Sequence, residues 1–247
     1  MAEGELPICL VAHMDTVFST VPQKIYYDQE ETTLWSPQGL GADDRAGIFA
    51  IVELLNRGCR PSIIFTDLEE KGGIGASALV KDYFNCPFEK CNALIQLDRA
   101  GKNDAVYYDC DNKDFEEWIT CYGFITSYGS FSDISVFGPE WGIAAVNLSV
   151  GYEDEHSYVE TLNVTHLYST INKVEQILID IELYGMEFYE YIPFEYPQNK
   201  FTSFLNHTCV NCNKSIPYGE GYWCDPADRK VKICNECYDE IIGNIKS

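Results

Sequence analysis

Short apolar runs alternate with amphipathic stretches along the chain as far as residue 192. The runs at residues 8–12, 62–66, 93–97 and 143–150 have the length and composition of buried strands. Helical spacing predicts a helix that begins after Asp43 and stops at Gly58, and further helices over residues 76–83, 114–121, 133–137 and 165–184. This order predicts an α/β fold with a mostly parallel sheet sandwiched by helices.

Acidic residues and histidines gather where the predicted strands end. His13–Asp15, Glu69–Glu70, Asp98 and Asp154–His156 each follow a strand, and Asp43–Asp44 precedes the first helix. Any one of these is more often a solvated cap or a hydrogen-bonded structural residue. In a parallel sheet, however, ligands bind beyond the carboxyl ends of the strands. Five clusters at one edge therefore indicate a functional site.

The residue types in these clusters suit a pair of zinc ions. His13, Asp43, Glu70, Asp98 and His156 supply two imidazoles and three carboxylates. Two neighbouring dications need carboxylates to offset their charge, one of them touching both metals, and imidazoles to complete the coordination. Such a pair activates a water molecule for hydrolysis. Cobalt or manganese would suit the same ligands.

Two further carboxylates have roles beside the metals. Glu69 stands next to Glu70, so one side chain can bind metal while the other faces the attacking water as general base. Asp15 lies two residues after His13, on the same side of a strand, where it can hydrogen-bond the far nitrogen of the imidazole.

These stretches resemble the co-catalytic metallopeptidases of the M20 and M28 type, the zinc exopeptidase superfamily. The matching segments, in the order of the family, are Ala12–Val17, Gly41–Gly47, Asp67–Glu70, Leu97–Gly101 and Glu155–Ser157. The resemblance implies a zinc-exopeptidase (phosphorylase/hydrolase-like) fold.

The resemblance also implies a role for each residue. His13 and Asp98 would bind one metal, Glu70 and His156 the other, and Asp43 would bridge them, with a cis peptide bond at Asp43–Asp44. Glu69 would be the base and Asp15 the orienting carboxylate. Ser132–Asp133 is similar to a Ser/Thr-Asp pair of the lidless members, and Tyr128 is the candidate to polarise the scissile carbonyl, or else a packed surface tyrosine.

The chain departs from the family in two ways. Only 12 residues precede His13, so an oligomer or a partner is expected to cover that edge of the sheet. The 57 residues between Asp98 and His156 leave no room for the inserted lid of the M20 branch, so the catalytic domain resembles the lidless M28 aminopeptidases.

Five of the 11 cysteines crowd into the C-terminal part of the chain. Cys209 and Cys212 form one Cys-x-x-Cys knuckle, and Cys234 and Cys237 form a second. Paired knuckles at this spacing indicate one structural zinc, in a module that looks like a zinc ribbon or treble clef. We therefore divide the chain into a catalytic domain (1–192), a linker (193–206) and a zinc module (207–247), with a short helix at 235–242.

The charge of the chain limits its partners. Lys and Arg number 17 against 39 Asp and Glu, a net charge of −22, so neither nucleic acid nor an anionic membrane surface is an expected partner. The sequence has no apolar segment of membrane-spanning length and no signal peptide, which indicates a cytoplasmic protein with cysteines as thiols or metal ligands.

The sequence thus favours a two-zinc exopeptidase or related amide hydrolase, aminopeptidase-like, acting on a peptide or an N-acyl amino acid. Aminopeptidase, carboxypeptidase and deacylase remain open, since Arg45 or Arg99 could meet a substrate carboxylate or pair with the acidic surface. The alternative is a non-catalytic peptide-binding or scaffold protein that retains the fold, with the zinc finger mediating a protein interaction.

Overall fold

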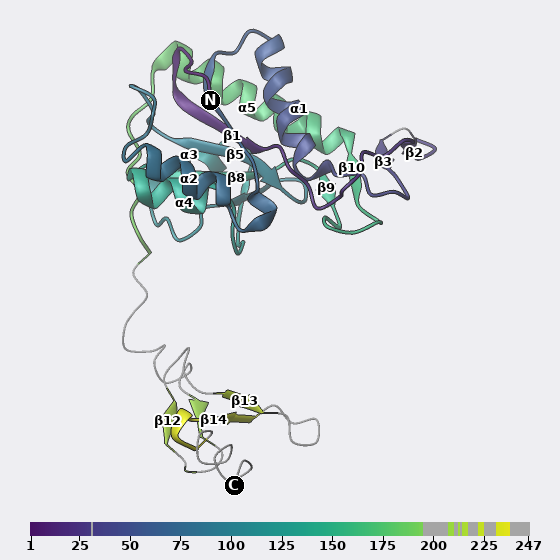
Figure 1. The fold of residues 1–247 in the computed structure, drawn as a ribbon. Coiled ribbons are helices and arrows are strands. Elements are labelled where there is room, and N and C mark those ends of the chain that lie inside the picture. Colours follow the sequence, from purple (N-terminus) through teal and green to yellow (C-terminus); the bar gives the residue numbers. More distant parts are fainter. Residues whose placement is uncertain are drawn as a thin grey trace. The chain divides into compact units, whose positions relative to one another are not determined.

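The computed structural model describes residues 1–30, 32–194, 207–209, 212, 214–216, 222–224 and 231–237. The chain divides into two compact units, Met1–Phe194 and Glu195–Ser247 (Figure 1). Within the described ranges, no helix combines the length and hydrophobicity needed to cross a membrane.

A six-stranded sheet forms the centre of the first unit. Its order is β4 (Pro61–Thr66), β1 (Leu6–His13), β5 (Leu94–Arg99), β8 (Ala145–Ser149), β6 (Asp104–Val106) and β7 (Ile125–Ser127). The first four strands are mutually parallel, β6 is antiparallel to β8, and β7 is parallel to β6. The predicted α/β fold with a mostly parallel sheet is confirmed.

The alternation of side chains along β1 explains why both faces of the sheet need covering. Ile8, Leu10 and Ala12 belong to one core cluster, whereas Cys9 and Val11 belong to another. All five are fully buried, as expected when the successive side chains of a strand point to opposite faces and helices cover both.

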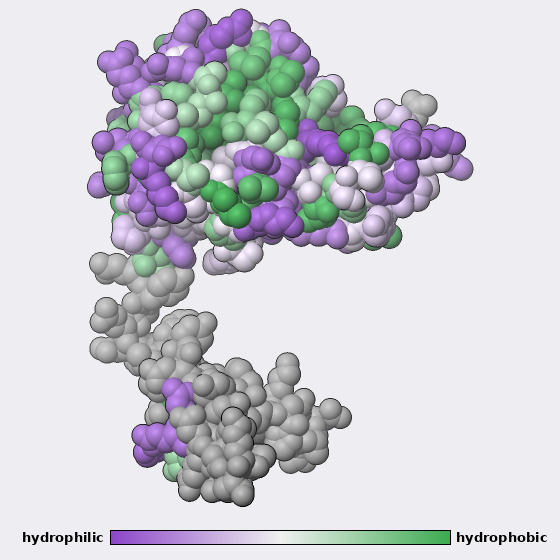
Figure 2. Space-filling view, viewed as in Figure 1, coloured by the Kyte–Doolittle hydropathy of each residue, from purple (hydrophilic) through white to green (hydrophobic). Residues whose placement is uncertain are grey.

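Helices supply that cover (Figure 1). Helices α1 (Ala42–Asn56) and α5 (Val164–Tyr184) lie on one face of the sheet, and α2 (Ile74–Asp82) and α4 (Ile134–Trp141) lie on the other. Helix α3 (Lys113–Thr120) adds Phe115 and Ile119 to the core beneath α1 and α5. Hydrophobic residues reach the surface over the region of α1 and α5 in the view of Figure 2.

Helix α4 is longer than the sequence predicts. It continues from residue 137 to Trp141 because Phe137 and Trp141, one turn apart, stack with ring centroids 4.6 Å apart and pack on the second core cluster.

A second, four-stranded antiparallel sheet was not predicted. Its order is β2 (Tyr26–Tyr27), β3 (Thr33–Trp35), β10 (Thr161–Asn163) and β9 (Tyr152–Glu153). Strands of two or three residues are too short to show an alternating pattern. Tyr27, Leu34, Leu162 and Tyr152 pair across the four strands and so share one face of this sheet.

The outer edge of β4 carries one further pairing. Ala2 forms an antiparallel bridge with Ile63, with an Ala2 N to Ile63 O distance of 2.9 Å. This bridge covers part of the edge for which the sequence predicts a partner.

The described part of the second unit contains two antiparallel pairs of short strands. Strand β11 (His207–Thr208) pairs with β12 (Ser215–Ile216), and β13 (Tyr222–Cys224) pairs with β14 (Val231–Ile233). Residues 235–237 are helical, and the rest of the predicted helix to residue 242 lies outside the described residues. Of the predicted linker, Pro193 bridges to Cys110, and residues 195–206 lie outside the described ranges.

Candidate metal centre

Five segments bring their polar residues to one edge of the central sheet. His13 is the last residue of β1, Asp98 is the next to last of β5, and Asp43 lies in the first turn of α1. Glu70 follows β4, and His156 follows β8 and β9. Because β1, β4, β5 and β8 are parallel, their carboxyl ends meet there.

Asp43 stands between the two histidines. Its Oδ1 lies 3.0 Å from His13 Nε2, and its Oδ2 lies 3.1 Å from His156 Nε2. His13 Nε2 also lies 3.4 Å from Asp98 Oδ1, and His156 Nε2 lies 2.9 Å from Glu70 Oε2. All five residues singled out from the sequence as metal ligands therefore lie in one cluster.

The backbone around Asp43 is held by two buried carboxylates that sequence reasoning did not assign. Glu160 accepts hydrogen bonds from Gly41 N at 2.5 Å and Asp43 N at 3.0 Å. Asp44 accepts from His13 N at 3.1 Å and Gly47 N at 2.9 Å, so its carboxylate serves the backbone. The peptide bond between Asp43 and Asp44 is cis, as the resemblance implies.

Asp15 connects the first imidazole with the turn that carries the two glutamates. His13 Nδ1, the nitrogen that faces away from Asp43, lies 3.0 Å from the backbone carbonyl oxygen of Asp15 and 3.3 Å from its Oδ1. The two carboxylate oxygens of Asp15 accept from Glu69 N at 3.1 Å and Glu70 N at 3.2 Å. The expected placement on a strand is wrong, because β1 ends at His13 and Asp15 reaches back from the following loop.

Glu69 and Glu70 occupy a single 3-10 turn, Glu69–Lys71. Within the described part of the chain, no hydrogen-bond donor reaches the buried Glu70 Oε1. Burial, with the nearby charge of Asp98, raises the pKa of Glu69 to about 8. A carboxyl group with this pKa can take up and release a proton near neutral pH.

A set of buried polar side chains holds Asp98. Gln96 Nε2 donates to Asp98 Oδ2 at 3.0 Å, Ser132 Oγ donates to the same oxygen at 3.3 Å, and Tyr152 OH donates to Oδ1 at 3.2 Å. Ser132 belongs to the Ser-Asp pair noted in the sequence. Gln96 was missed, although an amide inside an apolar strand signals a buried hydrogen bond.

Tyr128 lies apart from these contacts. Its side chain is 92% exposed, and its backbone carbonyl accepts from Arg99 Nη2 at 3.3 Å. Its hydroxyl forms no hydrogen bond within the described residues, so its role in polarising a carbonyl stays a prediction. Arg99 also lies 4.0 Å from Asp104, as expected for pairing with the acidic surface.

The electrostatics of the cluster suit cations. Six carboxylates surround two imidazoles, so the charge stays negative even with both imidazoles protonated; the carboxylates are Asp15, Asp43, Asp44, Glu69, Glu70 and Asp98. Burial raises the pKa of Asp98 to about 7, and the hydrogen bond to Asp43 raises that of His156 to about 9. Ligand atoms of His13, Asp43 and Glu70, and of His13, Asp44 and Asp98, lie within 4.8 Å of one another. Both groups contain His13, and their imidazole and carboxylate donors are of the kind that zinc takes.

The second unit carries the four predicted cysteine ligands together. The Sγ atoms of Cys209, Cys212, Cys234 and Cys237 lie within 4.8 Å of one another. Cys234 N donates to Cys209 Sγ at 3.4 Å, and Cys209 and Cys237 are buried. Four converging sulfurs fit a tetrahedral zinc. Cys224 and His207 are the remaining cysteine and histidine of this unit, and their side chains lie outside what the structure describes.

Two solved structures share the fold of the first unit. Aminopeptidase PepT from Bacillus cereus ATCC 10987 matches with a TM-score of 0.53 and 18% identity, over 71% of this chain and 80% of that one. A tripeptidase from Staphylococcus aureus subsp. aureus Mu50 matches with a TM-score of 0.55 and 16% identity, over 70% of this chain and 80% of that one.

Two sequence comparisons were informative in different ways. Among curated proteins, none matches the chain significantly. The model of peptidase family M28 matches residues 2–122, which include His13, Asp43, Glu70 and Asp98. The predicted resemblance to the M28-type metallopeptidases is therefore confirmed over residues 2–122, about half of the chain.

Proposed function

We propose that the protein is a two-zinc exopeptidase of the aminopeptidase type. One observation carries the proposal: the two oxygens of Asp43 face different imidazoles, at 3.0 Å from His13 Nε2 and 3.1 Å from His156 Nε2. A carboxylate in this position can bridge two metals, one on each side. Asp43 is buried, whereas the side chain of His156 is 51% exposed, which leaves that side of the centre open to solvent and substrate.

The two metals would divide the remaining ligands. His13 and Asp98 would hold one zinc, since His13 Nε2 lies 3.4 Å from Asp98 Oδ1. Glu70 and His156 would hold the other, with 2.9 Å between Glu70 Oε2 and His156 Nε2. Cobalt or manganese would suit the same donors. When bound, the metal pair lowers the pKa of water and polarises the scissile carbonyl.

Glu69 is the proposed general base. It would take the proton of the attacking water and return it to the leaving amine when the amide bond breaks, so that no net proton is consumed. The 3-10 turn supports this role, because it places Glu69 directly beside Glu70, which would hold a metal. Asp15 would keep Glu69 in place through the Glu69 N to Asp15 Oδ1 hydrogen bond of 3.1 Å.

Peptides with a free amino terminus are the substrate class we favour. Carboxylates outnumber imidazoles at the centre, so the cluster as a whole is negative and would attract a substrate ammonium group. The names of the two solved neighbours, an aminopeptidase and a tripeptidase, agree with this choice.

The second unit would bind one structural zinc through its four cysteines. The described strands of this unit are two or three residues long, so metal coordination would provide much of its folding free energy. We assign it a role in protein interaction, because the acidic chain does not favour nucleic acid.

We place the enzyme in the cytoplasm, where thiols stay reduced. The sequence-based expectation that the cysteines are thiols or metal ligands agrees with this. The edge strand β4, paired on its outer side at Ala2, is where we expect a partner or a second copy to add.

The test is Glu69→Gln in the full chain, assayed on short peptides with free amino termini. Loss of a general base should lower kcat by a factor of about 10² to 10⁴ while the zinc content stays unchanged. The control is Glu153→Gln, a conservative change at an exposed position on β9. Turnover by Glu69→Gln equal to that of the unmodified protein would rule out the proposed mechanism.

A further inference from the structure

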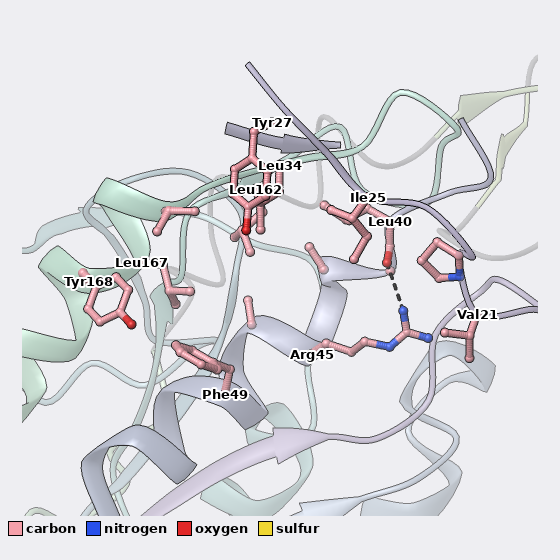
Figure 3. A pocket seen from close by; sticks show the side chains of 15 residues that line it. Val21, Ile25, Tyr27, Leu34, Leu40, Arg45, Phe49, Leu162, Leu167 and Tyr168 are labelled. Carbon is pink, nitrogen blue, oxygen red and sulfur yellow. Dashed lines mark hydrogen bonds between the residues drawn. The ribbon is translucent and has the colours of Figure 1, made fainter. Parts of the chain in front are cut away.

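A cavity of about 480 Å³ lies in the first unit, and none of the five proposed metal ligands lines it. Figure 3 shows it between helix α1, the start of helix α5 and one face of the four-stranded sheet, with the segment of Val21 and Ile25 along one side. Its volume falls in the range of small-molecule sites, roughly 300–1,000 Å³.

The walls are apolar. The sheet contributes Tyr27, Leu34 and Leu162, which pair across three strands and so point to the same side. Phe49 of α1 and Tyr168 of α5 close one end, with ring centroids 6.1 Å apart. Tyr27, Phe49 and Tyr168 remain partly exposed, so an apolar ligand would cover surface that water now touches.

One cation reaches this cavity, at the end opposite Phe49 (Figure 3). Arg45 is half-buried, and its Nη1 donates to the carbonyl of Leu40 at 2.9 Å. Within the described residues Arg45 makes no ion pair, whereas Arg57 and Arg99 each contact a carboxylate. Arg60 also makes no ion pair among the described residues, but only Arg45 lines the cavity.

We propose that this cavity binds a small monocarboxylate with an apolar body, such as a medium-chain fatty acid. The carboxylate would pair with the guanidinium of Arg45, which offers further N–H groups beside the one bound to Leu40. The apolar body would lie between the sheet face of Leu34 and Leu162 and the rings of Phe49 and Tyr168. The ligand thus matches both the charge at one end and the apolar walls.

The cavity also adjoins the backbone that carries Asp43. Gly41 and Ala42 line it, and Glu160 binds the N–H groups of Gly41 and Asp43. We nevertheless treat its ligand as distinct from the proposed peptide substrate, because neither the proposed metal ligands nor Glu69 lines the cavity.

Isothermal titration calorimetry on the zinc-loaded full chain tests the proposal, with octanoate as the probe. Octan-1-ol matches its chain without the charge, and acetate matches the charge without the chain. We expect octanoate to bind one per chain, about tenfold tighter than octan-1-ol, since a charge-assisted pair contributes on this order. Acetate should bind too weakly to measure at this site.

Two variants locate the binding. Arg45→Gln should lower the affinity for octanoate about tenfold and leave that for octan-1-ol unchanged. Phe49→Ser, at a partly exposed position, should weaken both ligands. Arg60→Gln is the matched control, because Arg60 Nη1 binds only the carbonyls of Leu55 and Cys59.

Three results would overturn the proposal. The first is that octanoate does not bind to the unmodified chain. The second is that octanoate binds equally well to the Arg45→Gln variant. The third is that the chain forms a dimer that Phe49→Ser abolishes and octanoate does not affect. The third result would assign this surface to a second copy. Because these readouts are affinities and oligomeric state, they do not depend on the proposed peptidase activity.

Discussion

At the residue scale, Asp15 shows how one carboxylate can organise several parts of the centre. Its Oδ1 lies 3.3 Å from His13 Nδ1, and its two oxygens separately accept the N–H groups of Glu69 and Glu70. The backbone carbonyl of Asp15 also lies 3.0 Å from His13 Nδ1, so the carbonyl and the carboxylate orient the imidazole together, while the carboxylate alone fixes the turn that carries the proposed base. Outer carboxylates of this kind fix the ring orientation of metal-binding histidines.

Asp15→Asn should lower the zinc affinity of the paired site by a factor of about 10 to 100. An amide has one acceptor oxygen, and its NH₂ group would face an N–H donor of the Glu69–Lys71 turn. Competition with a fluorescent zinc chelator measures the effect. The control is Asp67→Asn. The exposed carboxylate of Asp67 accepts only from Leu68 N, and the amide oxygen of an asparagine can also accept this hydrogen bond. Equal zinc affinity in both variants would contradict the role given to Asp15.

At the scale of elements, helix α1 must approach strand β5 closely to place Asp43. Gly47 makes this approach achievable, because a Cβ on it would stand 1.9 Å from the carbonyl oxygen of Leu97 and 2.4 Å from Asp44 Oδ1. Gly47 N also donates to Asp44 Oδ1 at 2.9 Å. The first turns of α1 are thus held against the strand that carries Asp98.

Gly47→Ala should destabilise the protein by about 1–3 kcal/mol or more, because the added methyl group overpacks a backbone contact that cannot move alone. It should also lower the occupancy of the paired zinc site. Urea unfolding and zinc analysis measure the two effects. Val52→Ala, at an exposed position of the same helix, is the control. Wild-type stability in Gly47→Ala would show that α1 can shift freely.

The elements also show which parts of the fold could be predicted from the sequence and which could not. The long buried strands and helices could be predicted because their apolar periods are strong, and the parallel topology then brought His13, Asp43, Glu70, Asp98 and His156 to one edge. The four-stranded sheet could not be predicted, since its strands have two or three residues. Glu160 was missed for the same reason: its contact with Gly41 N spans 119 residues and depends on that sheet.

At the scale of the whole molecule, the chain carries a net charge of −22, and much of the buried part of that charge lies at the metal centre. Burial raises the pKa of Glu69 to about 8 and that of Asp98 to about 7. Without metal, these carboxyl groups repel one another once they ionise. The proposed zinc ions would remove that repulsion.

The metal-free protein should therefore lose stability as the pH rises from about 5 to 9. Glu69 and Asp98 hold protons in the folded state at a pH where the unfolded chain, with carboxyl pKa values of about 4, has released them. His156, with a pKa of about 9, acts in the same direction. Melting temperatures in a chelator across this range measure the slope. A melting temperature that rises with pH would contradict the description of the centre.

The most direct test of the two-metal centre is the zinc content of the full chain, measured by elemental analysis after loading and removal of free metal. The account predicts about three zinc ions per chain, two at the centre and one at the four cysteines. The Asp43→Asn variant should retain about one zinc ion per chain, the one at the four cysteines, because the carboxylate that would bridge the metal pair is lost. A full chain that holds only one zinc, or an Asp43→Asn variant that holds as many as the unmodified protein, would contradict a metal pair bridged by Asp43.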